Sequence, residues 1–420
     1  MSSPVDRRRS PVRALPAGVW AMGVASLFMD TSSELIHSLL PVFMVSVLGA
    51  SVVTVGVIEG VAEATAAMLK VVSGAVSDWL GRRKGQMVLG YGLAALTKPI
   101  FPLATSVGWV FSARFVDRMG KGIRGAPRDA LVADITPAGL RGAAYGLRQA
   151  LDSVGALLGP ALALAFMLIL AGDIRKVMWI GVVPAFLAVA VLMVFVREPE
   201  RMPAHPATRS PLAMTAVRRL SMEFWLVVLL GAVFTLARFS EAFLVLRAQD
   251  VGLGLALVPA VMIVMNVGYA GAAFPAGAAA DRVDQRKLLL AGLVLLIVSD
   301  LALAFARSPL VVLAGAALWG LHMAFTQGLL SKLVADTAPA DLRGTAFGLF
   351  NLVSGGALLL ANLIAGALWS AFGATATFAA GAAFAAVAAA GVIARRAAGG
   401  RDGGAAEAPR IRVGKGSKKP

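Results

Sequence analysis

The chain has 420 residues, of which 58% are hydrophobic and only 15% are charged, and its mean hydropathy is +0.80. Soluble domains usually carry about 25% charged residues, so this composition excludes an ordinary soluble fold and predicts a membrane protein. The formal net charge of +16 could indicate nucleic-acid binding if the bases formed one patch, and the lack of cysteine excludes disulfides and thiolate metal sites.

Twelve apolar stretches follow one another along the chain, each long enough at roughly 20 residues to cross a bilayer. They lie near 20–48, 52–76, 86–106, 108–130, 143–170, 177–196, 222–247, 255–280, 288–306, 310–333, 345–370 and 373–394. We therefore predict an all-α integral membrane protein with twelve transmembrane helices. Its segments are an N-terminal arm 1–19, a six-helix bundle 20–196, a linker 197–221, a second six-helix bundle 222–394, and a basic, disordered tail 395–420.

The basic residues divide unevenly between the two ends of these spans. One end carries Arg7, Arg8, Arg9, Arg13, Arg82, Arg83, Lys84, Arg197, Arg201, Arg209, Arg218, Arg219, Arg282, Arg286, Lys287 and the tail from Arg395 to Lys419. The loops at the other end hold chiefly Arg175, Lys176, Arg247 and Arg307. This bias is the positive-inside pattern, so it predicts cytoplasmic termini and explains the net charge without nucleic acid.

The first span contains an unusual polar stretch, FMDTSSELIH. Asp30, Glu34 and His37 fall on one stripe of a helix, and each of them is costly to bury in a bilayer. Two interpretations stay open. In the first, the acids couple solute movement to protons. In the second, the three groups coordinate a divalent cation together with Glu59 and Glu63.

Two pairs of segments repeat at nearly one spacing. ADITPAGLRGAAYGL (133–147) and ADTAPADLRGTAFGL (335–349) agree at ten of fifteen positions with an offset of 202. GAVSDWLGRRK (74–84) and GAAADRVDQRK (277–287) correspond at an offset of 203. The chain therefore consists of two related halves of six spans, an arrangement in which a solute path lies between the halves.

These motifs resemble those of the major facilitator superfamily of transporters. The residues that match its loop signature, here called the loop motif, are Gly74, Asp78, Gly81, Arg82 and Arg83, with Gly277, Asp281, Arg282 and Arg286 in the second copy. Trp79 departs from that signature, which usually has a base there. In the fifth span Gly146, Gly155, Gly159 and Pro160 match the spacing of the family's antiporter signature, although Ala163 and Leu164 replace its closing glycine pair. The resemblance implies a transporter, and more often an exporter than an importer.

Acid–base pairing is the physical role expected of the loop motif. Asp78 lies at the cytoplasmic end of the second span, directly before Arg82 and Arg83. It can pair with these bases or with a helix N-terminus across the seam, which would hold a cytoplasmic gate in one of its states.

Charged residues inside the spans predict a polar cavity. A basic stripe on the fourth span favours an anionic or zwitterionic solute, because charges that cannot face lipid must face the path or each other. The residues predicted to line the path or couple protons are Asp30, Glu34, His37, Glu59, Glu63, Arg114, Asp117, Arg118, Arg148, Asp152, Arg238 and Glu241.

We therefore predict a proton-coupled secondary transporter in the inner or plasma membrane that exports a small charged solute or drug as a monomer. Its expected partners are that solute, protons and the lipid bilayer, with no cofactor, no resident metal and no nucleic acid. A divalent cation transporter is the alternative, and a non-transporting receptor or a membrane enzyme is more remote. The chain shows no recognised nucleophile motif and no glycine-rich phosphate loop.

Overall fold

The computed structural model describes residues 14–80, 82–198, 217, 219–280, 283–326, 329–339 and 342–402, and the regular structure within these ranges is helical. The first half contains α1 (Ala17–His37), α2 (Leu40–Val42), η2 (Phe43–Val47), α3 (Val52–Leu80), α4 (Lys84–Thr97), α5 (Ile100–Leu103), α6 (Val107–Ile135), η3 (Ala138–Leu140), α7 (Arg141–Ile169) and α8 (Ile174–Phe195). The second contains α10 (Met222–Leu236), α11 (Ala242–Asp250), η4 (Leu255–Leu257), α12 (Ala260–Ala280), α13 (Gln285–Ala304), α14 (Pro309–Thr326), α15 (Leu329–Thr337), α16 (Arg343–Phe372) and α17 (Ala374–Asp402).

Eight helices of the described part are long and apolar enough to cross a membrane, namely α3, α7, α8, α12, α13, α14, α16 and α17. Large apolar side chains on their outer surfaces are exposed, as at Phe274, Leu310 and Phe372, which fits helices surrounded by lipid. The other predicted spans contain α1, α4 with α5, the charged α6, and α10 with α11. The chain is a multi-pass membrane protein, whereas the count of twelve spans and the cytoplasmic termini remain predictions.

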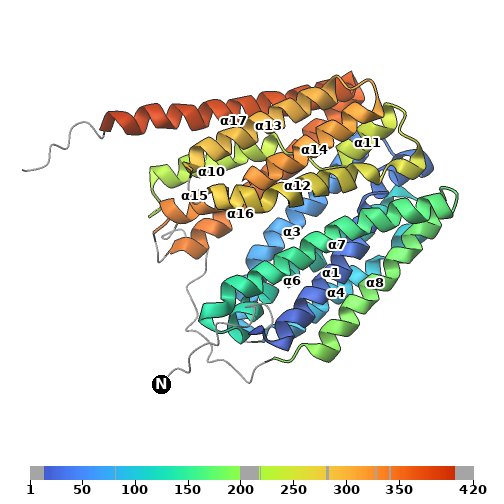
Figure 1. Cartoon of the computed structure of the whole chain (residues 1–420), viewed down its shortest axis with the longest axis horizontal. Coiled ribbons are helices and arrows are strands. Elements are labelled where there is room, and N and C mark those ends of the chain that lie inside the picture. Colours follow the sequence, from blue (N-terminus) through green and yellow to red (C-terminus); the bar gives the residue numbers. More distant parts are fainter. Residues whose placement is uncertain are drawn as a thin grey trace, which may run out of the picture.

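The two halves form two helical bundles that lie side by side (Figure 1). They meet chiefly where α3 packs along α16 and α7 packs against α12. Glycines make the first of these contacts possible, because a Cβ at Gly366 would lie 2.9 Å from Cα of Val53 and a Cβ at Gly56 would collide with the carbonyl of Asn362.

One predicted span is interrupted. The sequence analysis treats 222–247 as a single span, but the structure divides it into α10 and α11 with a non-helical break at Ala237–Glu241. Irregular backbone at membrane depth must have its polar groups satisfied within the protein. The backbone N–H of Ser240 meets this requirement by donating to Oδ1 of Asn362 on α16 at 2.8 Å.

Several predicted segments lie wholly or partly outside the described residues. These are most of the arm 1–19, the linker residues 199–216 and the tail after Asp402. Helix α17 itself continues beyond residue 394, where the sequence analysis ends the second bundle.

The ends of the bundles define two sides of the molecule. The side at which α8 ends and α10 begins is called here the linker side, and the opposite side, with α2, η2, α11 and η4, is called the far side. On the far side the halves touch, because α2 packs against α11, η4 packs against α7, and Nε2 of Gln249 donates to Oγ of Ser46 at 2.7 Å. The structure therefore describes a state that is closed on the far side.

Candidate functional site

A cavity of about 780 Å³ lies between the two halves. It extends from Pro41 and Val245 near the far side to Asp129 and Leu330 toward the linker side. Ten of the twelve residues predicted for the path line it, and they are Asp30, Glu34, His37, Glu59, Glu63, Arg114, Arg118, Asp152, Arg238 and Glu241. Their part in transport stays a prediction.

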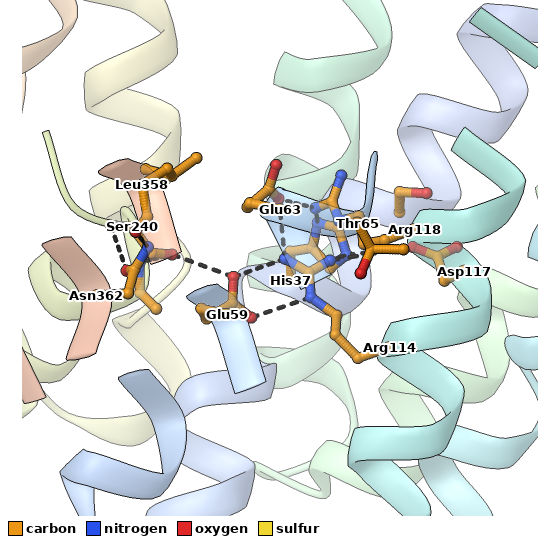
Figure 2. Close-up of polar contacts among 12 residues, drawn as sticks. His37, Glu59, Glu63, Thr65, Arg114, Asp117, Arg118, Ser240, Leu358 and Asn362 are labelled. Atoms are coloured by element: carbon orange, nitrogen blue, oxygen red, sulfur yellow. Dashed lines mark hydrogen bonds and ion pairs between the residues drawn. The ribbon is translucent and has the colours of Figure 1, made fainter. Parts of the chain in front are cut away.

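Arg114 on α6 forms the centre of an ion-pair network in the first half. Its Nε and Nη2 donate to the two carboxylate oxygens of Glu59 on α3 at 3.0 and 2.7 Å, and both side chains are almost fully buried. The geometry is the two-pronged pairing that a guanidinium makes with a carboxylate. Nη1 of Arg114 also donates to Nε2 of His37 (Figure 2).

A second pair lies one helical turn further along α6. Nη2 of Arg118 lies 2.9 Å from Oε1 of Glu63 and 3.4 Å from Nδ1 of His37. The ring of His37 is therefore held between two guanidinium groups, as Figure 2 shows. Two positive groups at this ring oppose the entry of a further cation.

Asp117 and Arg148, the other two predicted residues, lie outside the cavity lining. Oδ1 of Asp117 accepts a hydrogen bond from Nζ of the fully buried Lys98 at 2.8 Å, and Lys98 also donates to Oγ of Ser33 at 2.9 Å. Nη1 of Arg148 donates to Asp152 at 2.8 Å, which is the i,i+4 contact that neutralises both groups. Both residues therefore support charges near the cavity.

A further cluster lies closer to the linker side. Arg128 donates to Oγ of Ser26 at 2.7 Å, and Ser26 in turn bonds the hydroxyl of Tyr91 at 2.9 Å. The guanidinium of Arg124 lies over the Tyr91 ring, 4.6 Å from its centroid. These contacts join α1, α4 and α6 and fix the basic face of α6 toward the cavity.

The break between α10 and α11 brings the second half to this network. Oγ of Ser240 donates to Oε2 of Glu59 at 3.1 Å, so one hydroxyl links the halves in the middle of the cavity. Figure 2 shows Ser240 and Asn362 facing Glu59 and Arg114 across this seam. Arg238 and Glu241 lie at the break, and they form no ion pair with each other among the described residues.

Four charged residues of the first half line the cavity with weak or no pairing. Among the described residues Asp30, Lys70 and Lys121 make no ion pair or hydrogen bond through their side chains, and Glu34 has only His37, at 3.8 Å. Asp30 and Glu34 lie on α1, four residues apart. Their carboxyl groups therefore face the cavity without a close basic partner among the described residues.

The glycines of the antiporter-like motif hold α7 against this part of α1. A Cβ at Gly155 would lie 2.7 Å from the carbonyl of Leu27, and one at Gly159 would lie 2.7 Å from the carbonyl of Thr31. No atom lies within 4 Å of a Cβ at Gly146. Two of the glycines are thus needed for the helix contact that presents the acids of α1, and Gly146 is not.

The loop motif is described only in part. The side chain of Asp78 and residues Gly81, Asp281 and Arg282 lie outside the described part, so the predicted gate pairing is not tested. Nε of Arg83 lies 3.1 Å from Oδ2 of Asp134 on α6, and the backbone N–H of Arg83 donates to Glu198 at the start of the linker.

The sequence analysis missed two buried charges on matching helices. Lys98 follows α4, and Asp300 lies on α13 at the repeat offset of 202. Asp300 is fully buried, and neither of its oxygens has a hydrogen-bond partner among the described residues. Each of these charges stands within an apolar run of the sequence, which is the signal that could have found it. The repeat offset of 202 would then have related the two positions to each other.

Comparison with known proteins identifies the family. The model of the Major Facilitator Superfamily matches residues 22–265 and 242–415. The chain belongs to the Major Facilitator Superfamily. It is accordingly a transporter of that superfamily, which is not a class of enzymes, and the expected all-α membrane fold with two repeats is confirmed.

The relatives and solved structures agree with this assignment. An uncharacterized MFS-type transporter of Methanocaldococcus jannaschii is 34% identical over 85% of this chain and 89% of its own length. The tetracycline resistance protein, class H, of Pasteurella multocida is 26% identical over 66% of this chain and 71% of its own. The crystal structure of a POT family transporter in complex with 5-aminolevulinic acid superposes with a TM-score of 0.76, at 13% identity over 93% of this chain and 99% of that one.

Proposed function

We propose that the protein is a proton-coupled secondary transporter that exports a small anionic or zwitterionic solute or drug by alternating access. It would work as a monomer in the inner or plasma membrane. The observation that carries the proposal is the cavity between the halves, closed on the far side, with the weakly paired carboxyl groups of Asp30 and Glu34 in its wall.

The chemistry of these acids suits a proton carrier. Glu59 and Glu63 are held by Arg114 and Arg118, so their charges are already balanced. Asp30 and Glu34 have no arginine partner among the described residues, so their carboxyl groups face the cavity without a fixed counter-charge, and carboxyl groups are common proton carriers in proteins.

Two observations support export. The spacing of Gly146, Gly155, Gly159 and Pro160 resembles the antiporter signature of the family, and Gly155 and Gly159 pack directly on the acid-bearing part of α1. One relative over two thirds of the chain is a tetracycline resistance protein, which makes an exported drug a reasonable solute.

Reconstituted variants of the two acids test the coupling. A panel of small anions, zwitterions and tetracycline is first scored by thermal shift, because binding to the native state raises stability. The best solute is then followed in proteoliposomes containing Asp30→Asn, Glu34→Gln or the matched control Glu223→Gln, which lies exposed at the linker-side start of α10. We expect pH-gradient-driven flux to be lost in both cavity variants, while solute-for-solute counterflow survives in at least one.

The outcomes separate the two interpretations of the polar stretch FMDTSSELIH in the first span. Normal gradient-driven flux in both cavity variants would contradict proton coupling through these acids. Loss of flux and counterflow together, with binding that no longer responds to a divalent cation, would favour the cation alternative instead.

A further inference from the structure

The two walls of the cavity differ sharply in chemistry. Each half contributes twenty lining residues, of which thirteen are Asp, Glu, His, Lys or Arg in the first half and only two in the second. The ionisable residues of the first wall are Asp30, Glu34, His37, Glu59, Glu63, Lys70, Arg114, Arg118, Lys121, Arg124, Arg128, Asp129 and Asp152.

The second wall carries the large apolar side chains of the cavity. Arg238 and Glu241 are its two residues of the Asp, Glu, His, Lys and Arg types, and both lie at the break between α10 and α11. The rest of the wall on α10, α12, α14 and α16 includes Phe234, Met262, Met265, Met323, Phe350 and Leu358. The first wall has no large apolar side chain, since its uncharged members are small or polar. Methionine side chains adapt to ligands of irregular shape.

The most exposed charges of the first wall are positive, although the half-buried acids Asp30 and Glu34 also line it. The first wall has as many Asp and Glu residues as Lys and Arg residues, but Glu59, Glu63 and Asp152 form ion pairs with arginines. The lining side chains that are exposed and charged are Lys70 and Lys121, and neither makes an ion pair among the described residues. A ligand in the cavity therefore finds two exposed ammonium groups without an ion-pair partner among the described residues.

We propose that the substrate of this cavity is an amphipathic organic anion. Its negative group lies at Lys70 and Lys121, and its apolar body lies along the methionine and phenylalanine wall of the second half. The inference rests on the proposed function, because it names the substrate class of the same cavity. An apolar body of this kind gains affinity from surface removed from water, which a small hydrophilic anion cannot do.

Two matched series of probes test the proposal on the full-length protein in lipid nanodiscs. Butane-, hexane- and octanesulfonate differ only in chain length, and the trimethylammonium compounds with the same chains differ from them in the sign of the charge. Dissociation constants come from the dependence of the thermal shift on concentration. We expect sulfonate affinity to rise about fourfold per fully buried methylene, and the ammonium series to bind at least tenfold more weakly.

Variants assign the two ends of the probe. Met323→Ser should weaken octanesulfonate binding severalfold and leave butanesulfonate nearly unchanged, whereas the same change at Met193, exposed on the outside of α8, should do neither. Lys70→Gln with Lys121→Gln should remove the preference for sulfonates, and Lys176→Gln, an exposed far-side lysine, serves as its control.

Specific results would overturn the proposal. Equal or tighter binding of the ammonium series contradicts the anionic class, and affinity independent of chain length contradicts the apolar wall. Met323→Ser behaving like Met193→Ser also contradicts that wall. Failure of the proposed function would give a different result. Octanesulfonate that binds as expected but shows no counterflow would contradict the proposed transport, and the class of ligand that the cavity binds would still stand.

Discussion

The hydroxyl of Ser240 should hold the two halves together in the state described here. It donates to Oε2 of Glu59 at 3.1 Å across the seam between α10–α11 and α3. Opening of the far side separates these elements, so the bond is expected in this state and not in the opposite one. Ser240→Ala should therefore shift the equilibrium toward the state that is open on the far side.

The size of the shift follows from the contact. A hydrogen bond to a charged group contributes about 1.5–3 kcal/mol, and the lower end applies because Ser240 is only half-buried. A change of about 1.4 kcal/mol is a factor of ten in an equilibrium constant. The ratio of far-side-open to far-side-closed protein should thus rise about tenfold.

Thiol labelling measures this ratio directly, because the chain has no cysteine. Met262→Cys places one thiol in the cavity wall near the far side, where the native side chain is 5% exposed. A membrane-impermeant maleimide added from the far side can reach it only when that side opens. The labelling rate should rise about tenfold with Ser240→Ala.

A second serine supplies the control. Ser112 is exposed on α6, and its hydroxyl bonds only the carbonyl of Gly108 in its own helix. Ser112→Ala should leave the labelling rate unchanged. An unchanged or slower rate in Ser240→Ala would refute the view that this hydroxyl favours the closed far side.

Three further predictions concern stability and are read from thermal unfolding in detergent. Removing one partner of a buried ion pair costs about 3–5 kcal/mol, so Arg114→Ala should lower the unfolding temperature strongly. The double variant Arg114→Ala with Glu59→Gln should recover much of this loss, because neither charge is then left without a partner. No recovery would contradict the pairing. Lys98→Met should destabilise similarly by leaving Asp117 without its donor, and a wild-type unfolding temperature would show that Asp117 finds another partner. Gly159→Ala should cost about 1–3 kcal/mol through overpacking against α1, while Gly146→Ala should be neutral or stabilising; equal effects would refute the packing role.

Much of the fold can be predicted because it follows from the apolar stretches and from the internal repeat of the sequence. Each predicted apolar stretch is largely helical, although some, such as 20–48 and 222–247, contain more than one helix, and the repeat offsets anticipate two related bundles. The break at Ala237–Glu241 could not be predicted from the apolar pattern. It depends on Asn362, which lies far away in sequence and satisfies the backbone of Ser240.

The sequence predicts which residues line the site, but it does not predict which of their charges pair with each other. Charges within apolar spans identify the cavity wall, because such groups cannot face lipid. Which charges neutralise each other depends on helix packing, so the link of Arg114 to Glu59 rather than to Asp30 or Glu34 becomes visible only in the structure. Lys98 shows the same limit, since it lies inside the predicted span 86–106 and nothing in the sequence indicates that Asp117 is its partner.

The central claim is that the halves alternate around the cavity, and a reversible crosslink tests it most directly. Ser46 and Gln249 touch across the far side, so Ser46→Cys with Gln249→Cys can be joined by a short cleavable bis-thiosulfonate in this cysteine-free chain. The control pair Ser51→Cys with Thr54→Cys lies within one half, where the native hydroxyls are 2.9 Å apart. Counterflow should stop when the first pair is joined, return when a reductant cleaves the link, and continue throughout in the control. Counterflow at the uncrosslinked rate with the far side joined would contradict alternating access in this protein.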